Sequence, residues 1–78
     1  MSQDDQAALT EEAAAEMLRL VLPLLNKHGI PPTPQNYAVW YAFVTGENAA
    51  LKHAIEQCLA EGGKFTATLN KALYRRHI

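Results

Sequence analysis

The sequence IPPTPQNY, residues 30–37, decides how this chain is organised. Pro31 and Pro32 force an extended connector, because proline fixes its own φ and keeps the preceding residue out of the helical region. Thr33 is then a good N-cap, and Pro34 occupies the first helical position, where its missing N–H is not needed. The stretch therefore predicts that one helix ends before it and that another begins within it.

The segment after this connector is expected to form a helix over residues 34–45, which Gly46 ends. Its apolar residues occupy two faces, one with Tyr37, Trp40, Tyr41 and Val44 and the other with Val39 and Phe43. A helix that is apolar around so much of its circumference is either central to the domain or half of an interface. We expect Trp40 to belong to the core. We expect part of the aromatic set Tyr37, Tyr41 and Phe43 to border a protein-binding groove, because aromatic residues are enriched at interfaces.

Three further helices are predicted over about residues 10–28, 49–61 and 67–77, because apolar residues recur there at three- and four-residue steps. Asn48 and Thr66 are candidate N-caps for the second and third of these helices. The residues expected to face inward from the first helix are Ala14, Met17, Leu18, Val21, Leu22 and Leu25. Those expected to face inward from the other two are Leu51, Ala54, Ile55, Cys58 and Leu59, and then Phe65, Leu69, Ala72 and Leu73.

The first of these helices carries three signals along its length. Thr10 is a candidate N-cap because two glutamates follow it, and residues 1–9 are then either an extra turn or a frayed end. Pro23 removes a backbone donor inside the helix and is expected to bend it. Gly29 followed by the apolar Ile30 matches a Schellman-type stop.

No segment shows the sustained alternation of a β-strand. The sequence therefore predicts an all-α fold, a small irregular four-helix bundle that forms one domain over residues 1–78. We expect the connector to set the angle between the first two helices.

Composition and charge exclude several classes of function. Seven Lys and Arg against eight Asp and Glu give a net charge of −1, and we predict no nucleic-acid binding. The basic residues near the C-terminus are too few and lack interleaved exposed aromatics: Lys64, Lys71, Arg75 and Arg76. The longest apolar run, residues 20–25, is far shorter than the ~20 residues that a membrane span needs. The N-terminal sequence MSQDDQ is acidic where a signal peptide would be basic, so we predict a cytoplasmic protein.

We predict neither a metal site nor a catalytic centre. The candidate metal ligands besides carboxylates are His28, His53, His77 and Cys58, and no spacing among them supports a shared ion. The single cysteine cannot form an internal disulfide and is most simply a small buried hydrophobe. The sequence has no glycine-rich phosphate loop and no visible pairing of Ser or Cys with His.

Three stretches together resemble a known family. GIPPTPQNYAVWY at residues 29–41, VTGENAAL at 44–51 and LYRRHI at 73–78 resemble the N-terminal helical region of certain bacterial diguanylate cyclases, and the resemblance covers roughly residues 14–78. In that family a C-terminal catalytic domain, named for its Gly-Gly-Asp/Glu-Glu-Phe signature, condenses two GTP molecules into cyclic di-GMP.

The resemblance implies an accessory domain without catalytic residues of its own. Gly62 and Gly63 are followed by Lys64 and Phe65 rather than by an acidic pair that could bind magnesium. We therefore expect no cofactor in this chain, and GTP and Mg²⁺ only in a catalytic domain beyond it. No glycine or proline follows the helix predicted over residues 67–77, so we expect the natural chain to continue.

Several modes of action stay open from the sequence. The best-supported expectation is a regulatory domain that contacts protein, either a second copy of itself or a localisation or scaffold protein. Self-association would align two catalytic domains, which cyclases of this type need to face each other. The alternatives are a small-molecule sensor with a ligand held between helices near Trp40 and Tyr37, and a free-standing helical adaptor.

Overall fold

The computed structural model describes the backbone of residues 2–78 and the side chains of residues 11–78. Four helices follow one another along the chain: α1 (Ser2–Lys27), α2 (Pro34–Thr45), α3 (Ala49–Ala60) and α4 (Ala67–His77). No strand occurs in residues 2–78. The prediction of an all-α four-helix fold is confirmed.

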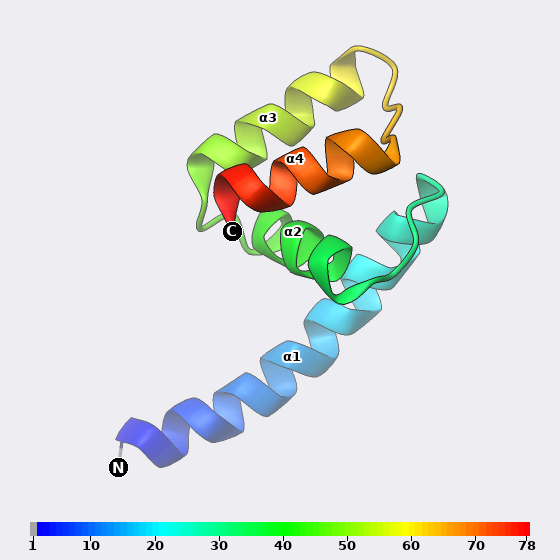
Figure 1. Cartoon of the computed structure of the whole chain (residues 1–78). Helices are drawn as coiled ribbons and strands as arrows, with labels where there is room; N and C mark the ends of the chain where they lie inside the picture. Colours follow the sequence, from blue (N-terminus) through cyan, green and yellow to red (C-terminus); the bar gives the residue numbers. More distant parts are fainter. Residues whose placement is uncertain (1) are drawn as a thin grey trace.

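Helix α2 is the centre of the arrangement. It lies against α1, α3 and α4, and α3 and α4 lie side by side and run in opposite directions (Figure 1). Only the C-terminal part of α1 packs on α2, and the rest of that helix projects away from the other three (Figure 1). The molecule is therefore elongated, with extents of 45 × 23 × 19 Å.

The connector between α1 and α2 is held by local hydrogen bonds. The Thr33 hydroxyl caps α2 by accepting from the Asn36 backbone N–H at 3.2 Å. The Asn36 side-chain amide donates back to the Pro31 carbonyl at 2.9 Å, and the Thr33 N–H donates to the same carbonyl at 2.8 Å. Because these bonds join the two ends of the connector, the prolines stay in one conformation relative to the start of α2.

A Schellman motif ends α1, as the sequence predicts. The Ile30 N–H donates to the Leu25 carbonyl at 2.8 Å and the Gly29 N–H donates to the Asn26 carbonyl at 3.2 Å. Gly29 has φ +67°, in the left-handed region that glycine adopts without strain. The apolar residues at the two ends of the motif, Leu25 and Ile30, are both buried in the core.

Replacing Gly29 with alanine should lower the free energy of unfolding by about 1 kcal/mol. A Cβ at this position would meet no heavy atom within 4 Å, so the whole effect comes from the backbone conformation. Urea denaturation followed by circular dichroism measures it. Gly29→Asn is the matched control. Asparagine tolerates this conformation better than alanine, so this variant should lose less free energy of unfolding. Equal losses for both variants would contradict the argument.

The N-termini of α3 and α4 are each capped by a polar side chain, Asn48 on α3 and Thr66 on α4. The Asn48 side-chain oxygen accepts from the Leu51 N–H at 3.0 Å, and its amide nitrogen donates to the His77 carbonyl at 3.1 Å. Thr66 caps α4 through the Leu69 N–H at 3.1 Å. Asn48 thus joins the first turn of α3 to the last turn of α4, which keeps the two antiparallel helices in register.

The start of α1 differs from the expectation. The helix begins at Ser2 rather than near residue 10, and Thr10 lies inside it instead of capping it. The physical reason is that neither glycine nor proline interrupts residues 2–10, so nothing stops the helix from extending. Pro23 lies within the continuous helix, as the sequence predicts, because a proline removes one intrahelical hydrogen bond without ending the remaining ones.

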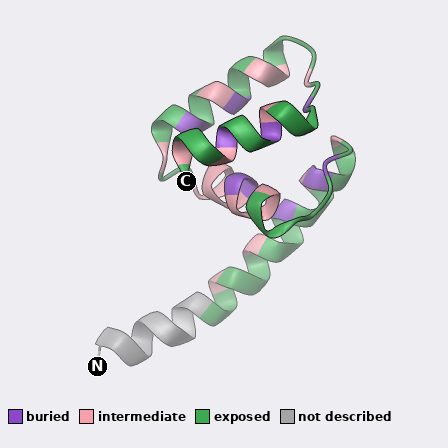
Figure 2. Ribbon diagram, in the orientation of Figure 1, coloured by how far each residue is buried: buried purple, intermediate pink, exposed green. Residues whose placement is uncertain are grey.

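The core is smaller on α1 than the apolar stripe predicts. Val21 and Leu25 are buried, whereas Leu18 and Leu22 are 47% and 41% exposed and Ala14 is exposed as well. The expected inward role of these three residues is wrong, because α2 covers only the last turns of α1 (Figure 2). Among residues 11–78, nine apolar residues are buried: Val21, Leu25, Ile30, Val39, Trp40, Leu51, Ile55, Phe65 and Leu73.

Candidate functional site

Trp40 lies at the centre of an aromatic cluster in the core. Its ring centroid is 5.2 Å from Phe43 and 5.2 Å from Phe65, both in edge-to-face arrangement, and 5.4 Å from the His28 ring, which stacks on it. The Trp40 side chain is 1% exposed, and its Nε1 is the one fully buried side-chain polar atom without a hydrogen-bond partner in residues 11–78. The expected core position of Trp40 is what the structure shows.

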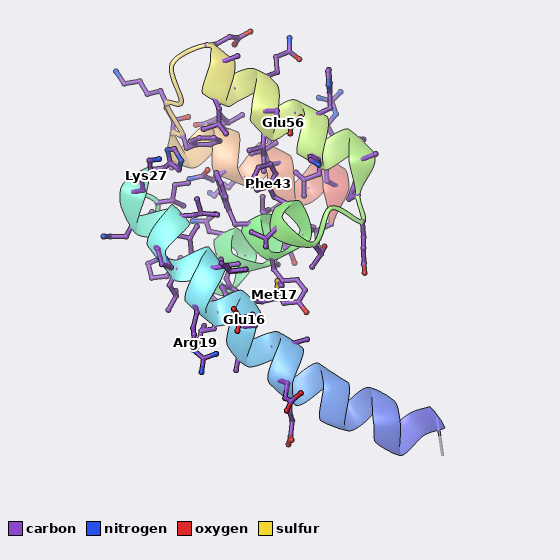
Figure 3. The ribbon with its side chains drawn as sticks, turned by 180° about the vertical axis from the view of Figure 1, so that it is seen from behind. Glu16, Met17, Arg19, Lys27, Phe43 and Glu56 are labelled. Carbon is purple, nitrogen blue, oxygen red and sulfur yellow. The ribbon has the colours of Figure 1, made fainter. Side chains whose placement is uncertain are left out.

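The three aromatic candidates for protein binding do not form one surface. Tyr37 and Tyr41 lie one turn apart, with ring centroids 5.9 Å from each other. Phe43 points from α2 toward Trp40 and the α3–α4 pair (Figure 3). All three are half-buried and pack against the core. The structure brings two of them together and separates the third, so their binding role stays a prediction.

A cavity of about 610 Å³ lies between the connector and α4. Pro31 and Thr33 line it from the connector, Asn36 from the first turn of α2, and Asn70, Lys71 and Arg75 from α4. The connector is extended and cannot pack as closely as a helix would, which leaves this space beside α4. Neither Trp40 nor Tyr37, the residues chosen from the sequence for a ligand between helices, lines the cavity.

The polar groups of this cavity are unusual for so small a domain. Asn70 is only 6% exposed, and none of the side-chain hydrogen bonds in residues 11–78 involves its amide. Lys71 and Arg75 lie one turn apart and are exposed. Within residues 11–78 the one ion pair lies elsewhere: it joins Arg19 to Glu16 at 3.3 Å on the projecting part of α1 (Figure 3). The cavity therefore has two cations without carboxylate partners and one amide, on the largely buried Asn70, whose nitrogen and oxygen remain accessible and form no side-chain hydrogen bond within residues 11–78.

The apolar pattern of α4 does not indicate this cavity, because it predicts a different buried face from the one in the structure. Ala72 was expected to face inward and is exposed, whereas the polar Asn70 is buried. The available signal was the spacing of Asn70, three residues before the buried Leu73 and five after the buried Phe65. A polar residue at that spacing indicates a buried amide, and buried amides almost always have a partner.

Apolar side chains are exposed on the projecting helix. Leu18 and Leu22 lie one turn apart on α1 and extend the stripe of the buried Val21 and Leu25 toward the N-terminus. Leu20 is 45% exposed and lies on the other side of the helix. The apolar stripe of α1 thus continues past the point where α2 covers it.

The other sequence candidates remain apart. In residues 11–78 no three His, Cys, Asp or Glu side chains come close enough to hold a metal ion. Cys58 is half-buried, and its thiol lies 3.8 Å from the Lys64 carbonyl. No helix within the described residues has the length and apolar character needed to cross a membrane.

Comparison with known proteins finds similarity to one diguanylate cyclase. The chain is 33% identical over 61 residues to Diguanylate cyclase VdcA of Vibrio cholerae serotype O1. These residues make up 78% of this chain but 18% of VdcA, so the similarity is to one region of that protein. No protein-family model matches the sequence, and no solved structure matches it significantly. The resemblance to diguanylate cyclases is confirmed as similarity to a region of one such enzyme.

Proposed function

We propose that this chain is a non-catalytic region of a diguanylate cyclase, which regulates cyclic di-GMP synthesis by bringing two copies of the protein together. The similarity to VdcA carries the proposal. Because the matched residues span 18% of VdcA and the chain lacks the catalytic signature, we assign GTP and Mg²⁺ binding to a separate domain that follows this one. We also propose that the chain acts in the cytoplasm, where GTP is available.

The exposed stripe on α1 supports self-association. Leu18 and Leu22 continue a buried stripe and are covered by nothing in the described residues, so a second copy of α1 packed along the stripe would bury them. An isologous contact of this kind relates the two copies by a twofold axis. Since cyclic di-GMP is made from two GTP molecules, such a contact would align two catalytic domains.

Docking to a localisation or scaffold protein is the alternative mode for the same region. Tyr37, Tyr41 and Phe43 remain our candidate contacts for such a partner, because they are half-buried rather than fully enclosed. A chain that stays monomeric in solution favours this mode over self-association.

An exchange of regions tests the proposed function. Three purified proteins are compared: VdcA, VdcA without the matched region, and VdcA with this chain in place of that region. We expect the deletion to lower cyclic di-GMP formation from GTP and Mg²⁺ by about tenfold at low enzyme concentration, because linked self-association raises the effective concentration of catalytic domains. We expect this chain to restore most of the lost activity.

The matched control is the same exchange with Leu18→Ser and Leu22→Ser in the inserted chain, which should behave like the deletion. Raising the enzyme concentration should reduce the differences in the rate of cyclic di-GMP formation among these proteins. An exchanged protein that stays as inactive as the deletion at every concentration would contradict the proposed function.

A further inference from the structure

We propose that the cavity between the connector and α4 binds a small organic anion with a flat apolar body. This inference is independent of the cyclase assignment, since it rests on the cavity alone. Its volume of about 610 Å³ lies within the roughly 300–1,000 Å³ that is typical of sites for small molecules.

The buried amide is the first observation that points to a ligand. Asn70 is 94% enclosed and lines the cavity, and its amide has no hydrogen-bond partner in residues 11–78. Burying an amide is unfavourable unless its donor and acceptor are paired. The nitrogen and oxygen of this amide remain accessible, and Asn70 lines the cavity, so it can both donate to and accept from a polar group of a bound molecule.

The charge at the rim selects an anion. Lys71 and Arg75 both line the cavity, and they lie one turn apart on the same face of α4. No aspartate or glutamate is among the lining residues, so this part of the molecule carries two positive charges although the whole chain has a net charge of −1. A carboxylate, sulfonate or phosphate group placed between Lys71 and Arg75 would accept charge-assisted hydrogen bonds from both.

The apolar residues that line the cavity indicate that the rest of the ligand is apolar. Phe65 lines the cavity and is 8% exposed, and Tyr74 lines it as a half-buried ring. Pro31 adds a rigid apolar surface from the connector. Aromatic rings pack best against flat apolar groups, so the favoured ligand has a ring system as well as an anion.

The probe 8-anilinonaphthalene-1-sulfonate combines these two features and tests the proposal. Fluorescence titration measures its affinity, and amide chemical shifts locate it on the ¹⁵N-labelled protein. We expect one saturable site, with shifts concentrated in residues 29–36 and 65–75. The uncharged analogue N-phenyl-1-naphthylamine should bind about tenfold more weakly, because it lacks the group that contacts the two cations.

Three variants separate the site from general surface binding. The double variant Lys71→Gln with Arg75→Gln should weaken the probe by about tenfold. Arg76→Gln is the matched control, since Arg76 is exposed on the same helix but does not line the cavity. The affinity of this variant for the probe should be unchanged. Asn70→Leu should weaken binding of the probe, because it removes the amide that can donate to and accept from the bound molecule.

Each outcome decides the question. Chemical shifts that concentrate on α1 near Leu18 and Leu22 would overturn the proposal, because the probe would then report the exposed apolar stripe. An Arg76→Gln protein that binds the probe as weakly as the double variant would also overturn it, since the position of the charge relative to the cavity would then not matter. A folded Asn70→Leu protein that binds the probe as tightly as the unmodified protein would contradict the contact between Asn70 and the bound molecule.

Discussion

Replacing Trp40 with alanine should remove most of the stability of this domain. Trp40 is 1% exposed and contacts Phe43, Phe65 and His28, so its removal leaves a large cavity at the centre of the core. Substitutions of this kind lower the free energy of unfolding by ~3–5 kcal/mol. A folded chain of this length is stable by roughly 4–12 kcal/mol in total. Because a domain this small buries relatively little of its surface, its stability lies toward the low end of that range. We therefore expect a protein that is largely unfolded or at its margin of stability at 25 °C, as measured by urea denaturation and circular dichroism.

Trp40→Phe is the informative control for this substitution. Phenylalanine keeps an aromatic ring against Phe43 and Phe65 and eliminates the buried Nε1, which has no partner in residues 11–78. Removing an unpaired buried donor offsets part of the lost volume. We expect a loss less than half that of alanine. A phenylalanine variant as unstable as the alanine variant would contradict the importance that we give to the aromatic contacts.

Serine at both Leu18 and Leu22 should prevent self-association without unfolding the domain. Each leucine buried at an interface contributes ~1–2 kcal/mol, and a twofold contact buries two leucines from each copy, so the double variant should raise the dimer dissociation constant by at least roughly a thousandfold. Both side chains are exposed in the single chain, at 47% and 41%, so the free energy of unfolding of the monomer should change little. Sedimentation equilibrium measures the dissociation constant, and urea denaturation at low protein concentration measures the stability.

Leu20→Ser is the matched control, because Leu20 is 45% exposed on the opposite side of the same helix. It makes the same chemical change at the same exposure and should leave the dissociation constant nearly unaltered. If Leu20→Ser weakens association as much as the double variant does, the contact does not follow the stripe that we describe.

The connector and the helix ends could be predicted because their hydrogen bonds join residues close in the sequence. Thr33 caps the N–H of Asn36, three residues away, and the Gly29–Ile30 stop bonds to carbonyls within the last two turns of α1. The two apolar faces of α2 left two possibilities, a central helix or half of an interface, and the structure shows that α2 is central.

The remaining features depend on how the helices are placed, which local patterns do not determine. Periodicity located the apolar stripe of α1, but it could not show that α2 covers Val21 and leaves Leu18 exposed. The rotation of α4 that buries Asn70 instead of Ala72 is set by packing on α2 and α3. The cavity could not be predicted for the same reason, because it exists only where the connector passes beside α4.

The measurement that tests self-association most directly is the solution mass of the unmodified chain over a hundredfold range of concentration. Sedimentation equilibrium gives this mass without labels or substitutions. We predict that the mass rises with concentration from 8.6 kDa toward twice that value, as one copy of α1 covers the stripe of another. A mass that stays at 8.6 kDa over the whole range would contradict self-association and leave docking to a different protein as the mode of action.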